Sequence, residues 1–463
     1  MTADPVAALK RLRATFAAGV TRPLSWRRAQ LRGMRGMLVD RETELLEAMR
    51  EDLGRPAAEG WLTDLLGVTR EIDHALANLD DWARPRRVRV PLALRPGRAT
   101  IAPEPLGVAL VIAPWNYPVH LLLVPMASAI AAGNSVMGKP SEVAAHTSAT
   151  LARLVPEYLD PAAVAVVEAD AGETAELLRH RFDHVFFTGS ARVGRLVMEA
   201  AARHLTPVTL ELGGKCPAIV DAGTDLAVTA RRIAFGKFLG AGQTCLAPDH
   251  VLVHREAEGA LVDALARAIR DLYGDDPRRS RDYGRVVSRA HVDRLRRLLE
   301  AGGYERVAAG GEIDEADRYV APTVLAGVSP EAPLMQEEIF GPILPVLPVA
   351  DLDAASAFVR ARPIPLAVYV FAEPAAARRV LAATRSGGAA IGTTILHAGI
   401  PDLPYGGLGE SGTGAYHGRH GFETFSHRRS VFVKPARPDP RSAYPPFRWL
   451  RLRGVRRLLR RLL

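Results

Sequence analysis

The segment DHVFFTGSARVGRLV, residues 183–197, decides the fold of this chain. Apolar residues fill 184–187, and Gly189 and Ser190 then form a turn before an amphipathic helix pattern. A strand followed at once by a helix is half of a βαβ unit, so the segment predicts a parallel sheet. The G-x-x-x-x-G spacing of Gly189 and Gly194 fits either a phosphate-binding turn or a simple tight turn.

The same alternation of strand and helix patterns runs from 106 to 220. The predicted strands are 107–114, 134–140, 164–170 and 183–189. The predicted helices begin near Val119, Glu142, Gly172 and Ala191. A second alternating region runs from 216 to about 400, and 463 residues are enough for two or three domains. The chain is therefore predicted to be an α/β protein with more than one domain.

The regions outside these two blocks have different patterns. Residues 6–83 have the pattern of helices with polar faces. Residues 88–105 alternate and turn at Pro-Gly, which predicts an exposed hairpin, and 423–435 predicts another exposed strand. These strands could pair with each other and extend the sheet of a neighbouring subunit, because an uncovered strand edge invites pairing.

Composition excludes several classes of protein. The chain is 48% apolar and 24% charged, as in soluble globular proteins. Its two cysteines exclude a disulfide framework and suit a reducing cytoplasm, and neither lies in a zinc-binding pattern, so no metal is predicted. The net charge is +9, but residues 437–463 carry nine arginines and one acid, which leaves the rest nearly neutral. This distribution argues against a nucleic-acid partner.

One long uncharged stretch, 106–138, could be mistaken for a membrane span. Pro114, Pro118 and Pro125 interrupt it, together with Asn116. These breaks favour a buried strand, loop and helix over a continuous spanning helix.

The two cysteines lie in different contexts. Cys216, in the apolar run KCPAIV, is typical of a structural residue. Cys245 lies in GQTCLAP, residues 242–248, where glycines permit close approach of the backbone to bound groups.

Charged residues at strand ends allow two interpretations each. Lys139 and Glu142 could hydrogen-bond a ribose, or could simply open a solvated helix. Glu211 is an isolated acid in an apolar strand, and is either a general base with a raised pKa or part of a structural ion pair.

Six motifs carry a family resemblance. They are PWNYP (114–118), GNSVMGKPSE (133–142), FTGS (187–190), LELGGK (210–215), GQTC (242–245) and EEIFGP (337–342). In this order they resemble the aldehyde dehydrogenase superfamily over about residues 5–435. The segments 280–285 and 400–430 resemble its class 3 branch, which includes fatty and aromatic aldehyde dehydrogenases.

The resemblance implies a fold and its division. It implies a Rossmann-like NAD(P)-binding domain, an α/β catalytic domain and a small β oligomerisation arm that makes a homodimer. The predicted ranges are 1–84 with 105–210, 211–404, and 85–104 with 421–435, followed by a basic tail, 437–463.

The resemblance also implies a mechanism for oxidising an aldehyde to a carboxylic acid. Cys245 would attack the carbonyl to give a thiohemiacetal and then a thioester, with Asn116 and the Cys245 backbone N–H holding the oxyanion. Glu211 would activate the hydrolytic water. The glycines beside Cys245 would then leave room for the thioester and a moving nicotinamide.

The cofactor residues carry over in the same way. Lys139 and Glu142 match residues that hold the adenosine ribose, and Glu338 with Phe340 matches those beside the nicotinamide ribose. The turn at Gly189 and Ser190, with Gly194 behind it, matches the pyrophosphate site. Glu142 favours NAD by repelling a 2′-phosphate, although class 3 members often accept NADP as well.

The tail segment RWLRLRGVRRLLRRLL, 448–463, has the pattern of a basic amphipathic helix. It could lie on the anionic inner face of a membrane, or be a solvated or subunit-packing helix. It is too short and too charged to span a bilayer.

Two alternatives to a hydrophobic-aldehyde dehydrogenase follow from the same residues. A CoA-acylating or semialdehyde-reducing enzyme is disfavoured by Glu211, since such enzymes do not pass the acyl group to activated water. A catalytically silent membrane-binding homologue is disfavoured by the complete set Asn116, Glu211, Cys245 and Glu338.

Overall fold

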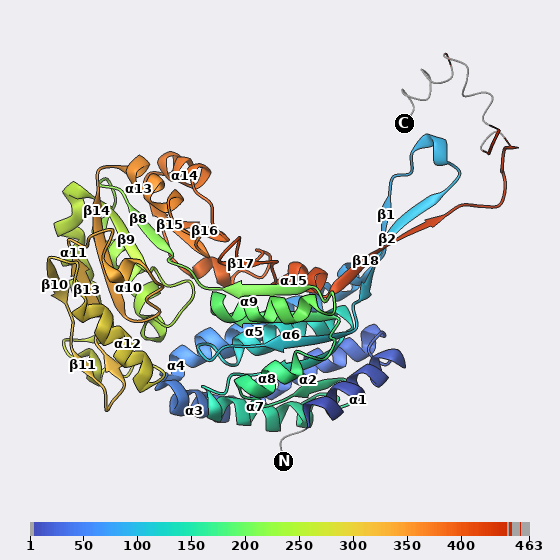
Figure 1. Cartoon of the computed structure of the whole chain (residues 1–463), viewed down its shortest axis with the longest axis horizontal. Helices are drawn as coiled ribbons and strands as arrows, with labels where there is room; N and C mark the ends of the chain where they lie inside the picture. Colours follow the sequence, from blue (N-terminus) through green and yellow to red (C-terminus); the bar gives the residue numbers. More distant parts are fainter. Residues whose placement is uncertain (1–3, 442–443, 447–453, 455–463) are drawn as a thin grey trace.

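The chain forms two α/β domains and a projecting β arm (Figure 1). The computed structural model describes residues 4–441, 444–446 and 454. Among these residues no helix is both long and apolar enough to cross a bilayer. Most of the predicted basic tail lies outside the described residues.

The first domain is built on a six-stranded sheet in the order β17-β7-β6-β3-β4-β5. Its strands are β3 (Val108–Ile112), β4 (Ser135–Lys139), β5 (Val164–Val166), β6 (His184–Gly189), β7 (Val208–Leu212) and β17 (Gly412–Thr413). The strands β3 to β7 are parallel, as the sequence predicts, and β17 is antiparallel to β7. β7 continues to Leu212, two residues beyond the predicted end of this domain, and β17 joins the sheet from near the C-terminus.

Helices cover both faces of this sheet. The helices of this domain are α1 (Pro5–Ala17), α2 (Leu24–Asp40), α3 (Glu42–Leu53), α4 (Ala57–Gly60), α5 (Leu66–Ala83), α6 (His120–Ala132), α7 (Ala145–Tyr158), α8 (Ala171–Leu177), α9 (Ala191–Ala202) and α15 (Gly418–Thr424). Alternate residues of β3 face opposite sides, so Leu110 packs with α1, α8 and α9, while Val111 packs with α6 and α7. The uncharged stretch 106–138 thus forms β3, a loop and the buried α6, which confirms its interpretation.

One helix start differs from its prediction. Helix α7 begins at Ala145 instead of near Glu142. Its cap comes from another helix, because Asp52 of α3 accepts the N–H groups of His146 (3.1 Å) and Thr147 (2.8 Å). The local sequence around Glu142 therefore holds no sign of the true start.

The second domain has a seven-stranded sheet in the order β10-β13-β14-β9-β8-β15-β16. Its strands are β8 (Pro217–Val220), β9 (His250–His254), β10 (Arg306–Ala309), β13 (Thr323–Ala326), β14 (Ile343–Val349), β15 (Ala367–Phe371) and β16 (Gly388–Ile391). Helices α10 (Leu226–Phe238) and α11 (Glu258–Tyr273) cover one face, and α12 (Arg289–Glu300), α13 (Leu352–Arg360) and α14 (Pro374–Ala383) cover the other. A small separate pair is formed by β11 (Ile313–Asp314) and β12 (Tyr319–Val320). Only β10 is antiparallel to its neighbour in the large sheet.

The arm is a three-stranded antiparallel sheet that projects from the first domain (Figure 1). It consists of β1 (Arg86–Val88), β2 (Arg98–Pro105) and β18 (Ser426–Val433). All eight residues of β18 pair with β2, from Ser426 opposite Pro105 to Val433 opposite Arg98. Two segments more than 300 residues apart thus form one element, as their exposed-strand patterns predict.

Candidate active site

Cys245 is positioned by a tightly wound backbone. It follows the short 3-10 segment η3 (Leu239–Gly242), in which Ala241 and Gly242 have φ of 51° and 75°. A Cβ added at Gly242 would lie 2.3 Å from the carbonyl oxygen of Gly341, so only glycine fits. The sequence predicts that these glycines leave room for the thioester and the nicotinamide. At Gly242 the structure shows close packing of two backbones instead.

Two cavities meet at the Cys245 side chain. One has a volume of about 260 Å³ and the other about 320 Å³, and both are lined by Leu121, Cys245 and Tyr405. The smaller cavity is also lined by six other predicted site residues: Asn116, Gly189, Ser190, Glu211, Glu338 and Phe340. Lys139, Glu142 and Gly194 do not line it. Cys245 therefore contributes to the walls of both cavities.

The surroundings of the sulfur favour the protonated thiol. Burial, together with the nearby carboxyls of Glu338 and Glu211, raises the pKa of Cys245 to about 12. The hydroxyl of Tyr405 lies 3.2 Å from Sγ and acts in the opposite direction. The thiol therefore needs help to become a nucleophilic thiolate.

Glu211 is a buried acid without a partner. It lies in β7, is 2% exposed, and neither carboxyl oxygen has a hydrogen-bond partner among the described residues. Burial raises its pKa well above the usual value. No ion pair to Glu211 occurs in the described part of the chain. The geometry therefore favours the general-base interpretation over the structural ion pair.

Asn116 is held between the two domains. Its Nδ2 donates to the backbone oxygen of Gln243 at 2.9 Å, and its own backbone oxygen accepts from Arg55 at 2.5 Å. The Gln243 side chain is itself fixed, since it donates to the Gly240 oxygen (3.0 Å) and accepts from the Val287 N–H (2.8 Å). The amide that would bind an oxyanion is thus tied to the loop that carries Cys245.

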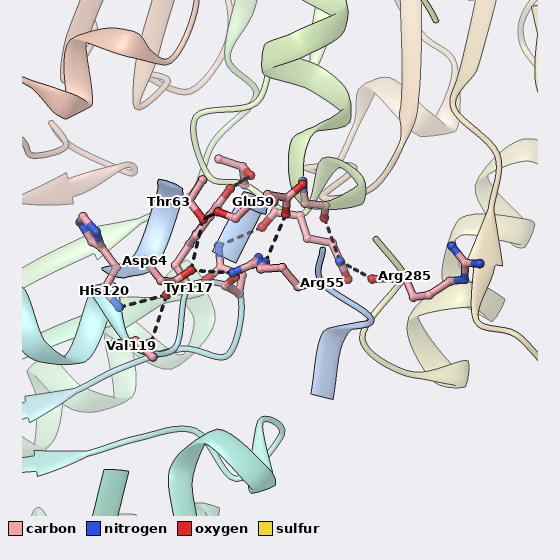
Figure 2. A network of polar contacts seen from close by, with 12 residues as sticks. Arg55, Glu59, Thr63, Asp64, Tyr117, Val119, His120 and Arg285 are labelled. Carbon is pink, nitrogen blue, oxygen red and sulfur yellow. Dashed lines mark hydrogen bonds and ion pairs between the residues drawn. The ribbon is translucent and has the colours of Figure 1, made fainter. Parts of the chain in front are cut away.

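A buried ion network holds these two loops together (Figure 2). Arg55 pairs with Asp64 at 2.7 Å and with Glu59 at 3.2 Å. Asp64 accepts the N–H groups of Val119 (3.2 Å) and His120 (3.0 Å), just after the Asn116 loop. Glu59 accepts the N–H of residue 240 at 3.1 Å, just before Cys245. The segment 55–64 therefore fixes both the Asn116 loop and the loop that carries Cys245.

The turn between β6 and α9 has the form of an anion site. Ser190 is the N-cap of α9, with its Oγ 3.4 Å from the Val193 N–H, and with Gly189 it lines the smaller cavity. A Cβ at Gly194 would lie 2.8 Å from the Leu212 side chain, so this glycine lets α9 pack closely on β7. The free N–H groups of the helix start fit a pyrophosphate.

Lys139 and Glu142 form an ion pair at the carboxyl end of β4. Lys139 Nζ lies 2.5 Å from Glu142 Oε2, with the Lys139 side chain 5% exposed and that of Glu142 45% exposed. The pair lies at the edge where parallel strands bind ligands, and it offers both a donor and an acceptor to ribose hydroxyls.

Glu338 and Phe340 complete the smaller cavity. The Glu338 carboxylate lies against Gly213 and accepts the N–H of Gly214, and burial raises its pKa to about 8. Phe340 packs edge-on against Trp115 at 5.5 Å. The N-terminus of α9 and the buried carboxyl of Glu338 line the same cavity. Together these residues fit a bound dinucleotide.

Sequence reasoning missed the residues that support this site. Arg55 lies in the connection between α3 and α4, Glu59 lies in α4, and Asp64 lies in the helical turn that follows it. The sequence predicts helices with polar faces over 6–83, and the i, i+4 and i+9 spacing of these charges gives no sign of burial. Tyr405 was overlooked because its ring reaches Cys245 only through the fold. Asp249 was also missed. It pairs with Lys215 and accepts the Ile339 N–H at 2.8 Å, which holds the segment containing Glu338.

The family model for the aldehyde dehydrogenase family matches residues 2–431. The chain therefore belongs to the aldehyde dehydrogenase family, and is an oxidoreductase that acts on aldehydes with NAD(P) as cofactor. Both the predicted family and the predicted fold are confirmed.

Similar proteins identify the branch of the family to which the chain is related. The chain is 44% identical over 441 residues to a rat protein named aldehyde dehydrogenase, dimeric NADP-preferring, covering 95% of this chain and 97% of that one. It is 46% identical over 454 residues to human aldehyde dehydrogenase family 3 member B1, covering 97% and 96%. The substrate-bound structure of Staphylococcus aureus AldH matches with a TM-score of 0.93 at 40% identity, covering 96% and 98%. These matches confirm the resemblance to the class 3 branch.

Proposed function

We propose that this aldehyde dehydrogenase oxidises medium- or long-chain aliphatic, or aromatic, aldehydes. The observation that carries the proposal is the larger of the two cavities at Cys245, whose lining does not include Gly189, Ser190, Glu338 or Phe340. Apolar side chains dominate its lining, among them Leu62, Leu66, Phe235, Leu239, Ile395 and Leu396. One wall is polar, with Glu71 and His417 3.3 Å apart. An apolar alkyl or aryl group gains free energy by leaving water for such a surface.

We assign the nucleophile to Cys245. Its thiolate attacks the aldehyde carbon, forming an S–C bond while the carbonyl electrons move to oxygen. The Asn116 amide and the Cys245 backbone N–H are the donors for that oxyanion. When bound, oxidised nicotinamide dinucleotide supplies the hydride acceptor for this reaction. We assign its binding to Gly189, Ser190, Glu338 and Phe340.

Hydrolysis of the resulting thioester is assigned to Glu211. Its carboxylate takes a proton from water, the hydroxide attacks the acyl carbon, and the S–C bond breaks to release the acid and restore Cys245. The raised pKa of Glu211 brings its basicity toward neutral pH, where a general base works best. A carboxyl without hydrogen-bond partners is also free to contact that water.

We further propose that Glu142 favours NAD. Its half-exposed carboxylate beside Lys139 would repel a 2′-phosphate, whereas a 2′-hydroxyl could donate to it. The preference for NADP stated in the name of the rat relative belongs to that protein. Whether this chain accepts NADP depends on how strongly the Glu142 carboxylate repels the 2′-phosphate of that cofactor.

A series of aldehydes tests the substrate proposal. Each added methylene should raise kcat/KM by about fourfold until the cavity is full, because each buried CH₂ contributes about 0.8 kcal/mol. The measurement is the initial rate of reduced cofactor formation for aliphatic chains of increasing length and for benzaldehydes, with NAD and NADP in parallel. Rates that are flat or fall from the shortest aldehyde upward would contradict the proposal.

We also propose that the arm makes a homodimer. The strands β1 and β18 are the edges of its sheet, and Val88, Phe432 and Val433 are exposed on it. An open edge with apolar side chains is suited to pairing with a second copy of the chain.

The basic tail is proposed to hold the enzyme on anionic membranes. The arm from which it extends adds exposed cations to the tail's nine arginines: Arg86, Arg87, Arg89, Arg95, Arg98 and Lys434. Basic residues near an anionic surface each contribute about 1 kcal/mol to binding.

Deletion of residues 437–463 should abolish binding to vesicles that contain anionic lipid, while aldehyde oxidation in solution persists. Co-sedimentation of the full chain and the truncated chain with anionic vesicles measures the effect, and vesicles of neutral lipid are the control. Equal sedimentation of both chains with anionic vesicles would refute the role of the tail.

A further inference from the structure

Tyr405 is the side chain whose polar atom reaches the Cys245 sulfur. Its hydroxyl lies 3.2 Å from Sγ, and it lines both cavities that meet there. Tyr405 lies in the connection between β16 and β17, far from Cys245 in sequence. Neither family motifs nor strand patterns single it out, because the contact arises only in the folded chain.

The Tyr405 ring is fixed by its surroundings. Its backbone N–H donates to the Tyr416 oxygen at 3.0 Å, and the Tyr416 N–H donates back at 2.8 Å. Its ring stacks on His417 with centroids 5.1 Å apart and planes at 14°, and meets Tyr416 edge-on at 5.5 Å. A ring held on two sides keeps its hydroxyl aimed at the sulfur, so little side-chain entropy is lost when the contact forms.

The direction of the hydrogen bond follows from proton affinities. Burial raises the pKa of Tyr405 well above that of an ordinary phenol, so the phenol keeps its proton when the sulfur ionises. A phenol beside a thiolate can then only donate. Hydrogen bonds to an ionised acceptor are stronger than those between neutral groups, so the contact favours the thiolate over the thiol.

Other titratable and charged groups line the cavities beside this sulfur. The titratable or charged side chains that line its two cavities, besides the two partners themselves, are Arg70, Glu71, Tyr117, His120, Glu211, His291, Arg294, Glu338, Tyr416 and His417. Of these, Glu211 and Glu338 raise the pKa of Cys245, while the Tyr405 hydroxyl lowers it. Tyr405 thus opposes two nearby acids that the reaction needs for other purposes.

We propose that Tyr405 is a further catalytic residue, whose hydroxyl donates a hydrogen bond to the Cys245 thiolate and so promotes formation of the nucleophile. The inference rests on the proposed role of Cys245. It adds a group that acts on the sulfur before bond formation. A thioester sulfur is a poor acceptor, so the hydroxyl has little effect on the acyl-enzyme until the S–C bond breaks and the thiolate forms again.

Alkylation of Cys245 in the full chain tests this role. The probe is iodoacetamide, which reacts with thiolates, and its site is followed by mass spectrometry, which separates Cys245 from the buried Cys216. In Tyr405→Phe the profile of alkylation rate against pH should move upward by about one pH unit, which slows the reaction about tenfold at a fixed pH below the midpoint.

A second readout separates this role from structural damage. In rapid-mixing experiments with aldehyde and cofactor, Tyr405→Phe should slow the burst of reduced cofactor about tenfold. It should slow hydrolysis of the acyl-enzyme far less, because hydroxide adds to the acyl carbon before the thiolate leaves. A general loosening of the site would slow both steps. Tyr369→Phe is the matched control, because it removes a buried phenol that donates to the Leu246 oxygen at 2.8 Å, next to Cys245, without touching the sulfur.

An unshifted pH profile in Tyr405→Phe, or equal slowing of burst and hydrolysis, would overturn the inference. The same holds if Tyr369→Phe shifts the profile as far as Tyr405→Phe does. If Cys245→Ser abolishes turnover while Tyr405→Phe leaves the profile in place, only this inference fails and the proposed function stands.

Discussion

Replacing Cys245 with serine should lower kcat/KM for aldehyde oxidation by about a thousandfold or more, because a serine hydroxyl does not ionise near neutral pH and nothing at this site is placed to deprotonate it fully. The contacts that Gln243 makes to hold this loop do not involve the sulfur, so the variant should fold. The measurement is the rate of reduced cofactor formation over a range of aldehyde concentrations, together with mass spectrometry of enzyme quenched during turnover. In the native enzyme the acyl group should be found on Cys245.

Cys216→Ser is the matched control for this variant. Cys216 is fully buried, its Sγ lies 3.4 Å from the Cys245 backbone oxygen and accepts the Ala367 N–H at 3.3 Å, and serine can keep both contacts. Its turnover should fall far less than that of Cys245→Ser. Native-like turnover in Cys245→Ser, or an acyl adduct on another atom, would remove the basis of the proposed mechanism.

Replacing Glu211 with glutamine should separate the two halves of the reaction. Acylation of Cys245 should still produce a burst of reduced cofactor, but steady-state turnover should fall by about a hundredfold to ten-thousandfold, because the water loses its general base. The acyl-enzyme should therefore accumulate and be visible by mass spectrometry. Hydrolysis in the native enzyme should speed up as pH rises through the raised pKa of Glu211, and the variant should lose this dependence.

Stability provides the control for Glu211→Gln. The folded-state pKa of Glu211 lies above its unfolded value, so the unfolded state binds fewer protons and native stability falls as pH rises above that unfolded value. Glutamine does not ionise, so the variant does not lose stability in this way as pH rises. It should therefore unfold at a temperature no lower than that of the native enzyme. Glu338→Gln, in the same cavity, should weaken the burst without accumulation of acyl-enzyme. Accumulation in both variants, or in neither, would contradict the assignment of Glu211.

Local sequence patterns predicted the strands of the first domain and the turn before α9 well. The strands β3, β4, β5 and β6 each fall inside a predicted apolar run, because a parallel strand buried on both faces must be apolar along its length. The glycine–serine turn before α9 could be found for the same reason, since a strand that feeds a helix needs a short, tight connection. The site residues were predicted from the ordered family motifs and not from the periodicity of apolar residues.

Contacts between distant segments could not be predicted. Arg55 looks like any solvated helix residue in sequence, yet its side chain is 2% exposed because Asp64, Glu59 and the Asn116 oxygen surround it. The start of α7 was misplaced because its cap, Asp52, comes from another helix. In each case the partner lies in a segment that only the tertiary fold brings near.

The late strand β17 has a consequence for how the enzyme is made. Gly412 pairs with Glu211, and Tyr405 reaches Cys245 from the same C-terminal stretch, while the Phe425 oxygen accepts from Asn134 Nδ2 at 2.9 Å. A chain emerging from the ribosome therefore presents its thiol, its acid and its dinucleotide turn long before the stretch that closes over them. Until Gly412 and Thr413 have been synthesised, β7 has an open edge.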